Sequence, residues 1–510
     1  MARGHKGDFA YENTGNALLE FFSKAGSLFK NKGTYHGDET TALELFKGAW
    51  ATNNHKAMQL AMWVRDCRGG SGNRSGFEDI INWLANKDSK WVLANMHFIP
   101  LVGRWKDLEA LLDTPCEDEA LKFWVRAIQD GNGLAAKWAP RSSKVNEKRK
   151  IAFNKLRKVA GMPPKDFRKL LSKNTDVVES RMCSKDWQDI DYSKVPSVAM
   201  ARYNSAFGKN DGPRFSGWKG ALEKGVDEEG NEVKVNAEVL FPHDVIRTLK
   251  SDIGDAYTDG NQYYGWDDES RRKDDTKFSD SKLANAQFKA LPDYLEGTGQ
   301  RVMSICDFSG SMCVPVSGSI MAIDVSMGLG LYCSDRLGES NPFYRKFIPF
   351  SDNSRLVDWK DETFSVAAQK HNDGWCGSTN VRSALNQILE AAKMFGASDE
   401  QIPNTLLIVS DMQWDQGTGN ENETSVEAGL KAWEETGYSR PKVVYWNLSG
   451  YRTSPATVKC QDVALVSGFS PSLLKAIFGG EDFSPMAILE KAIEKYEVVD
   501  PKDVKKEEVE

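Results

Sequence analysis

The chain has 510 residues, of which 40% are hydrophobic and 27% are charged. It is too long for a single small module and too apolar for a disordered protein, so it predicts two or three globular domains. Because 66 basic side chains stand against 73 acidic ones, the net charge is −7. Any nucleic-acid site must therefore be a local basic patch.

The cysteines and the hydropathy pattern indicate a cytosolic protein. The eight cysteines are scattered without a C-x-x-C pair, which argues against a structural zinc site and a dense disulfide framework. No apolar run reaches the roughly 18 residues of a membrane span, and the first residues lack the apolar core of a signal peptide. We therefore expect reduced thiols, no membrane partner and a cytoplasmic location.

From about residue 13 to 205, apolar side chains recur every three or four positions, as in amphipathic helices. Turns rich in Gly, Pro and Asn, such as Asp130–Gly133, separate these stretches. The pattern predicts an all-helical, HEAT-like repeat domain over residues 1–250. Residues 251–280 hold nine acidic side chains and few aliphatic ones, so we expect an acidic linker or insertion over 251–295.

Near residue 300 the pattern changes to short apolar runs that alternate with helical stretches. The apolar runs are residues 301–306, 344–350, 404–410, 442–446 and 463–466, and the helical stretches are about 318–334, 380–395 and 425–437. Parallel strands are usually connected by a helix, so this alternation predicts a doubly wound, parallel-sheet α/β domain over residues 296–500. Residues 501–510 form a charged tail.

Polar side chains follow two of these strands. Asp307, Ser309 and Ser311 follow the first strand, while Thr379 precedes a predicted helix and Asp411 follows the third strand. The carboxyl ends of the strands form the functional edge of an open α/β sheet. Oxygen-only ligands with so few charges suit a hard divalent cation, Mg²⁺ or Mn²⁺, and leave positions for water and a ligand carboxylate. The sequence predicts an open metal site.

This Asp-x-Ser-x-Ser pattern, with a later Thr and an Asp after a central strand, resembles the metal-ion-dependent adhesion site (MIDAS) of von Willebrand factor A domains. The resemblance covers the C-terminal 200 residues. It implies that Ser309, Ser311 and Thr379 contact the cation and that Asp307 and Asp411 act partly through water. The alternative is a serine-rich turn that caps the following helix, which leaves the two aspartates without a role.

Two enzymatic functions are alternatives to this metal site. An Asp after a first strand also resembles the nucleophile of phosphotransferases of the haloacid dehalogenase type. The motif of those enzymes is Asp-x-Asp, in which the second carboxylate is the general acid, and Ser309 occupies that second position here. A serine cannot replace a carboxylic acid in proton transfer at neutral pH. No Gly-x-Ser-x-Gly elbow is present, and His243 and His371 are isolated in the sequence. We expect a protein that is not an enzyme.

The helical region also carries family resemblances. The run Val64-Arg-Asp-Cys-Arg-Gly-Gly70 is similar to a turn in the helical TROVE module of telomerase-associated, Ro and vault proteins. Helical repeats joined to a von Willebrand A domain are the Ro architecture, which implies RNA binding. A closer resemblance is to an uncharacterised family of plants, fungi, bacteria and phages, which implies no activity and, for a phage protein, a host-cytoplasmic location. Its patterns are matched at residues 14–18, 103–108, 196–200, 242–243, 410–412, 445–448 and 464–470.

Residues 137–173 contain thirteen Lys or Arg and two acidic side chains, a local charge of +11. Such a basic helical face neutralises phosphates without reading bases, and it indicates a polyanion partner. Phe153 and Phe167 lie between these charges, but their helical spacing is typical of core residues rather than of stacking platforms. The alternative is a solvated face that pairs with acids elsewhere. The predicted RNA-binding residues are Lys137, Arg141, Lys144, Lys148, Arg149, Lys150, Lys155, Arg157, Lys158, Arg168 and Lys169.

Taken together, these patterns predict a noncatalytic, Ro-like scaffold. Its helical domain is expected to bind structured or misfolded small RNA, and its α/β domain to hold Mg²⁺ or Mn²⁺. The competing hypothesis is a protein-interaction module without RNA, in which a partner's Asp or Glu completes the coordination of the cation. A phosphotransferase is the second alternative.

Overall fold

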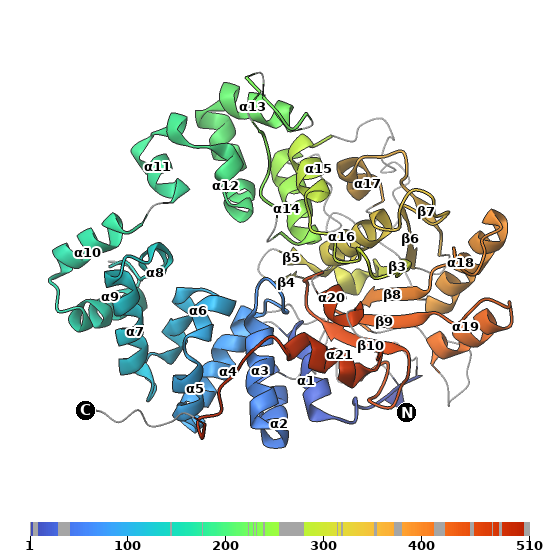
Figure 1. Ribbon diagram of the computed structural model, residues 1–510, viewed down its shortest axis with the longest axis horizontal. Coiled ribbons are helices and arrows are strands. Elements are labelled where there is room, and N and C mark those ends of the chain that lie inside the picture. Colours follow the sequence, from blue (N-terminus) through green and yellow to red (C-terminus); the bar gives the residue numbers. More distant parts are fainter. Residues whose placement is uncertain are drawn as a thin grey trace. The chain divides into compact units, whose positions relative to one another are not determined.

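The computed structural model shows a mixed α/β protein (Figure 1). Contacts divide the chain into two compact units, each built from two stretches of sequence. Unit 1 comprises residues 1–40 and 187–492, and unit 2 comprises residues 41–186 and 493–510. The structure describes residues 2–3, 9–28, 41–142, 145–175, 177–222, 224–227, 229–230, 232–237, 240–253, 280–313, 315–317, 320–350, 354–371, 380–412, 424–448, 453–471, 473–478 and 482–503.

Unit 2 is a series of helices, several of which contact the next helix in the chain, as α2 contacts α3, α3 contacts α4 and α4 contacts α5. The first of them begins with a capping box, in which Thr41 and Glu44 satisfy each other's backbone N–H groups. The large side chains of Trp63, Phe77 and Trp124 lie in the core of the unit. The elements are α2 (Ala42–Thr52), α3 (Asn54–Arg65), α4 (Arg74–Lys87), α5 (Ser89–Asn95), α6 (Phe98–Val102), η1 (Trp105–Leu111), α7 (Glu117–Gln129), α8 (Gly133–Trp138), α9 (Glu147–Val159), α10 (Pro164–Lys173) and α11 (Val178–Ser184).

The C-terminal segment of the chain packs against the helices of unit 2. The side-chain amide of Asn95 donates to the carbonyl of Val499 at 2.9 Å and accepts from its N–H at 2.8 Å. The Tyr496 hydroxyl donates to a carboxylate oxygen of Asp66 at 2.7 Å. The ring of Tyr496 is buried, so this segment is an integral part of the unit rather than a loose tail. Residues 504–510 of the predicted charged tail lie outside the described residues.

Unit 1 contains a six-stranded sheet in the order β10-β9-β8-β3-β6-β7. All neighbouring strands are parallel except β7, which is antiparallel to β6. The chain first builds outward from β3 to β6 and β7 and then returns to the other side of β3 with β8, which makes the β3–β8 boundary a topological switch point. The strands are β3 (Val302–Asp307), β6 (Lys346–Phe350), β7 (Val357–Asp358), β8 (Thr405–Ser410), β9 (Lys442–Asn447) and β10 (Val463–Ser467).

Helices from distant parts of the sequence pack within unit 1. One of them, α1, contacts β10, where the Ser467 hydroxyl donates to the Phe22 carbonyl at 2.9 Å. The helices are α1 (Ala17–Ala25), α12 (Ser197–Asn210), α13 (Gly212–Ala221), α14 (Pro242–Ile253), α15 (Lys282–Lys289), α16 (Ala322–Asp335), α17 (Phe364–Lys370), α18 (Val381–Phe395), α19 (Ser425–Glu434), α20 (Leu473–Phe478) and α21 (Pro485–Ile493). Short elements are β1 (Ala2–Arg3), β2 (Phe9–Ala10), β4 (Pro315–Ser317), β5 (Ile320–Met321), η2 (Trp187–Asp189), η3 (Tyr192–Lys194) and η7 (Gly310–Met312).

The predicted succession of a helical region and a parallel sheet is confirmed. The helix predicted at 318–334 begins later, at Ala322, because β4 and β5 pair as a short antiparallel ribbon before it. The predicted domain spans stay predictions. The compact units are a different division of the chain, in which α1 and α12 to α15 are grouped with the sheet. Most of the predicted acidic linker, residues 254–279, lies outside the described residues. Within the described part of the chain, no helix is both long and apolar enough to cross a bilayer.

His243 is the buried titratable group that most clearly links the packing of unit 1 to pH. It lies on α14, which packs on α16 at Gly328, where a Cβ would come within 2.9 Å of the His243 backbone nitrogen. The imidazole lies against the rings of Phe241 and Phe469. Burial lowers the pKa of His243 to about 4, because the charged form is desolvated in this apolar contact.

We expect acid to destabilise unit 1 through this histidine. Above about pH 6.5 both states hold a neutral imidazole, and between about 6.5 and 4 only the unfolded state binds the proton, so stability falls by up to about 3 kcal/mol. Urea denaturation across this range should show that His243→Gln reduces the pH dependence of the free energy of unfolding. The matched control is His97→Gln, an exposed histidine of unit 2. If the free energy of unfolding of His243→Gln depends on pH as steeply as that of the parent, His243 is not the source of the acid sensitivity.

Candidate functional site

The switch point of the sheet brings together polar side chains that are a hundred residues apart in sequence. β3 ends at Asp307 and β8 ends at Ser410, and the two strands are neighbours with Cys306 paired to Val409. Asp307, Ser410 and Asp411 therefore lie at the same carboxyl edge. This is the edge at which open α/β sheets bind ligands.

Asp307 is fully buried and is held by hydroxyl and backbone donors. The N–H of Ser309 donates to its Oδ1 at 2.9 Å, and the Ser410 hydroxyl donates to its Oδ2 at 2.6 Å. The hydroxyl oxygens of Ser309 and Ser311 are 3.0 Å apart. Ser309 does not cap the short η7 helix with its side chain, so the helix-capping alternative does not describe this serine.

The donor set at this edge fits a small hard cation. Two oxygen ligands in adjacent positions of an octahedron with metal–oxygen distances of about 2.1 Å are about 3 Å apart, which matches the separation of the Ser309 and Ser311 hydroxyls. Asp411 directly follows Ser410 and is buried, and Thr379 lies outside the described residues. Within the described residues, no group of three or more His, Cys, Asp or Glu could hold a metal ion.

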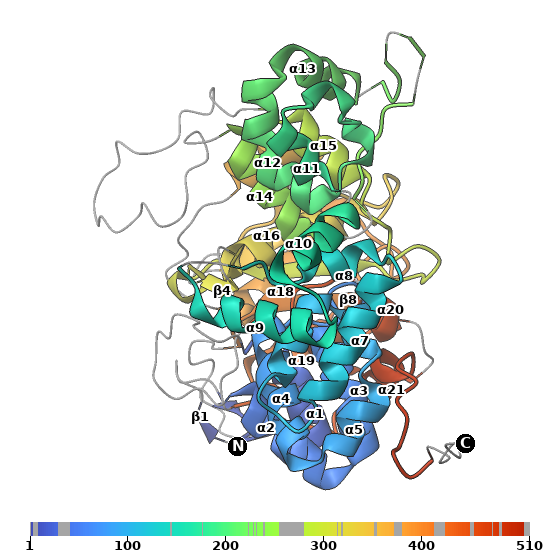
Figure 2. The same ribbon diagram turned by 90° about the vertical axis from the view of Figure 1, so that its left-hand side faces the viewer.

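The predicted basic residues lie on or beside α8, α9 and α10 of unit 2, which face the viewer in Figure 2. Three of them form ion pairs: Lys137 with Glu179, Lys150 with Glu147, and Lys155 with Asp113 and Glu117. Lys144 lies outside the described residues. Exposed cations include the predicted Arg141, Lys148, Arg149, Lys158, Arg168 and Lys169, together with Lys165 and Lys173, which were not among the predicted residues.

The aromatic side chains between these charges are core residues, as their spacing predicted. Phe153 and Phe167 are almost completely buried, and their ring centroids are 5.5 Å apart. They join α9 to α10 and leave the basic side chains on the outside of both helices. The outer face therefore offers charge to a ligand without offering these rings for stacking.

Two motifs that were recognised separately in the sequence meet at the buried Asp107. Arg65 lies in the 64–70 run, and its Nε donates to Asp107, in the 103–108 run, at 2.6 Å. A Cβ at Gly103 would lie 2.4 Å from the Asp107 carboxylate, so this position requires glycine. The resemblance identified both motifs, but nothing in their spacing showed that they form one ion pair.

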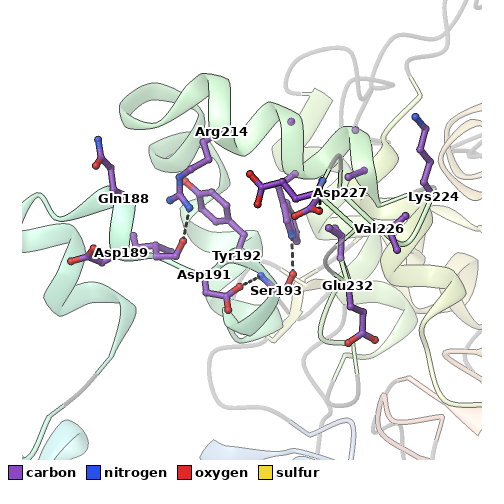
Figure 3. A pocket seen from close by; sticks show the side chains of 17 residues that line it. Gln188, Asp189, Asp191, Tyr192, Ser193, Arg214, Lys224, Val226, Asp227 and Glu232 are labelled. Carbon is purple, nitrogen blue, oxygen red and sulfur yellow. Dashed lines mark hydrogen bonds between the residues drawn. The ribbon is translucent and has the colours of Figure 1, made fainter.

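Unit 1 also contains a cleft of about 950 Å³ that the sequence did not indicate. Figure 3 shows Arg214 beside the ring of Tyr192. The central guanidinium carbon of Arg214 lies 4.7 Å from the centroid of that ring. Burial, reinforced by the hydrogen bond to Asp211, raises the pKa of the Tyr192 hydroxyl. The lining also includes five carboxylates, those of Asp189, Asp191, Asp227, Glu229 and Glu232. This chemistry suits a cationic ligand rather than a phosphate, and none of the predicted site residues lines the cleft.

Two family descriptions match the chain, and together they span almost all of it. Residues 4–129 and 140–300 match "Domain of unknown function (DUF2828)". Residues 301–510 match "Domain of unknown function (DUF7788)".

Two individual proteins are similar to the chain over nearly its whole length. The "Uncharacterized protein L728" of Acanthamoeba polyphaga mimivirus is 26% identical over 554 residues, which cover 99% of this chain and 89% of that protein. The crystal structure of the Deinococcus radiodurans RO (RSR) protein is 12% identical, with a TM-score of 0.44 and coverage of 94% of this chain and 99% of that one.

Proposed function

The chain belongs to the DUF2828 family, and we propose that its function is to bind structured RNA, including misfolded small RNA, along α8, α9 and α10 of unit 2. The observation that carries this proposal is the run of exposed cations on α9 and α10 within a chain of net charge −7. Within the described residues, Lys148, Lys158 and Lys169 form no ion pair. Unpaired surface cations attract phosphates without a cost for breaking existing contacts.

The proposed binding reads the backbone of the RNA rather than its bases. The exposed side chains on both helices are lysines and arginines, which position phosphates, while Phe153 and Phe167 are buried. Affinity would therefore depend on the shape and charge of a folded RNA more than on its sequence. A cytoplasmic scaffold that holds RNA without transforming it is the function that this surface supports best.

The second candidate function is cation-dependent binding of a protein partner by unit 1. The observation that favours it is the cluster of Asp307, Ser309 and Ser311 at the switch point of the sheet. In the proposed von Willebrand A-like site these residues, with Thr379 and Asp411, would hold Mg²⁺ or Mn²⁺. The bound cation would supply an open coordination position for a partner's Asp or Glu. The two functions use different units and are compatible.

We propose that neither site is catalytic. Ser309 occupies the position at which an aspartate-nucleophile phosphotransferase requires a carboxylic acid. His371 is buried, and its ring nitrogen contacts Glu362 at 2.9 Å; burial lowers the pKa of this histidine. His243 is buried among aromatic rings. These histidines have structural surroundings rather than a neighbouring nucleophile.

The first test removes three exposed cations, Lys148, Lys158 and Lys169, by substitution with Gln. Each lost phosphate contact lowers the slope of log affinity against log salt by just under one unit, so the triple variant should lose about 2 to 3 units of slope. Affinity should fall most at low salt. Fluorescence anisotropy with a structured RNA measures both quantities.

The matched control replaces Lys47, Lys87 and Lys90, which are also exposed lysines of unit 2 but lie on α2, α4 and α5. This variant has the same net charge and should keep most of the affinity and slope of the parent. Equal losses in the two triple variants would show that only the overall charge matters, and equal binding in all three proteins would refute the proposal.

The second test concerns the cation. Because a ligand that binds only the folded state stabilises it, Mg²⁺ or Mn²⁺ should raise the melting temperature. Asp307→Asn should abolish this rise, since it removes the central carboxylate while keeping its shape. Ser311→Ala should weaken it. A rise of the same size in Asp307→Asn would place any bound cation elsewhere.

The third test concerns catalysis. Purified protein with Mg²⁺ should hydrolyse neither phosphate monoesters nor nucleoside triphosphates faster than a blank, because the general acid is missing at Ser309. Phosphate release measured colorimetrically provides the readout. Turnover that disappears in Asp307→Asn would restore the phosphotransferase alternative.

A further inference from the structure

Three arginines of unit 2 converge on the single carboxylate of Asp107. Arg65 Nε lies 2.6 Å from Oδ2, Arg74 Nε lies 3.3 Å from Oδ1, and Arg104 Nε lies 3.2 Å from Oδ1. The three guanidinium groups come from the end of α3, the start of α4 and the residue before η1. Asp107 itself is fully buried.

The carboxylates at this cluster do not balance its arginines. Asp107 and Glu78, which lies 2.7 Å from Arg74, provide two negative charges against the three arginines. A third carboxylate near Arg74, that of Glu109, is paired with Lys106. Arg65 is buried against Asp107, and Arg74 is shared between Asp107 and Glu78. One positive charge remains, and Arg104 carries it.

The Arg104 guanidinium is held in place but keeps most of its donors available. Its Nε donates to Asp107, and its plane lies over the ring of Trp138, with the central carbon 4.7 Å from the ring centroid. Among the described residues its two terminal nitrogens have no hydrogen-bond partner, and its side chain is 24% exposed. A second cation, Lys137, lies 5.9 Å from the same ring.

We propose that the terminal nitrogens of Arg104 form a binding site for the terminal phosphate of an RNA strand. The proposal rests on the proposed RNA-binding function and names one phosphate that this unit would recognise. The ligand chemistry is a phosphate monoester, whose oxygens match the two-pronged geometry of a guanidinium.

A terminal phosphate fits this site better than a backbone phosphate for an electrostatic reason. Three guanidinium groups face the carboxylates of Asp107 and Glu78, so the ion pairs of this cluster leave positive charge incompletely compensated. A monoester carries close to two negative charges at neutral pH, whereas a phosphodiester carries one. The monoester therefore gains more from the surplus positive charge.

The Arg104 side chain packs on Trp138, but Asp107 does not depend on that side chain for all of its partners. Asp107 is already bound by Arg65, and it also accepts the backbone N–H of Arg104 at 3.1 Å, which any residue at this position would supply. Replacement of the side chain leaves these contacts in place. Arg104→Gln should therefore fold with Asp107 still paired.

The test compares a structured RNA that carries a 5′-phosphate with the same structured RNA ending in a 5′-hydroxyl. The full-length protein should bind the phosphorylated strand about tenfold more tightly, the gain expected for a charge-assisted hydrogen-bond pair. Arg104→Gln should abolish this preference and leave binding of the hydroxyl strand nearly unchanged. Arg104→Lys should retain part of the preference, because it keeps the charge and loses the fork.

The matched control is Arg126→Gln, which removes an exposed arginine of α7 outside the cluster and should preserve the preference. Equal affinities of the parent for the two strands overturn the inference while leaving RNA binding intact. If neither RNA binds, the RNA proposal fails. The heat of binding of inorganic phosphate, measured by calorimetry for the parent and for Arg104→Gln, then tests whether Arg104 binds a phosphate at all. Heat that is lost in Arg104→Gln then identifies free phosphate as the ligand, and no heat in the parent overturns the site.

Discussion

Unit 2 depends on two adjacent charged residues at the end of α3. Arg65 binds the buried carboxylate of Asp107 and thereby fixes the start of η1. Asp66 accepts hydrogen bonds from Lys495 and Tyr496 and thereby fixes the C-terminal segment. Breaking a buried ion pair leaves an uncompensated charge, which costs about 3 to 5 kcal/mol. Asp66 and Tyr496 are 430 residues apart in the sequence, so the end of α3 anchors a distant part of the chain as well as η1.

The same interaction creates the surplus charge from which a phosphate site is inferred. Arg65 satisfies Asp107 from the buried side, so Arg104 is needed neither to neutralise this carboxylate nor to hold it. The side chain of Arg104 is oriented by Asp107 and Trp138 instead. Pre-orientation of this kind reduces the entropy that a flexible arginine loses when it binds a ligand.

The two units present opposite chemistry to a ligand. In unit 2, α9 and α10 bury Phe153 and Phe167 against each other and expose lysines and arginines. In unit 1, the switch point buries Asp307 beside the Ser410 hydroxyl, and the lining of a separate cleft around Tyr192 includes five carboxylates and two cations, Arg214 and Lys224. Polyanions are attracted by the first surface and cations by the other two.

The sequence by itself determined the helical and parallel-sheet regions, because hydrophobic periodicity reflects which faces are buried. It also placed Asp307 and Ser309 at the end of a strand and assigned Phe153 to a core. Only the tertiary structure revealed that Ser410 binds Asp307, that Arg65 binds Asp107 and that Tyr496 belongs to unit 2. These contacts join residues far apart in the chain, and periodicity within a single helix or strand carries no information about which distant element it will meet. The sequence also could not show which lysines and arginines form ion pairs, because pairing with a carboxylate that is distant in the chain leaves no pattern in the local sequence.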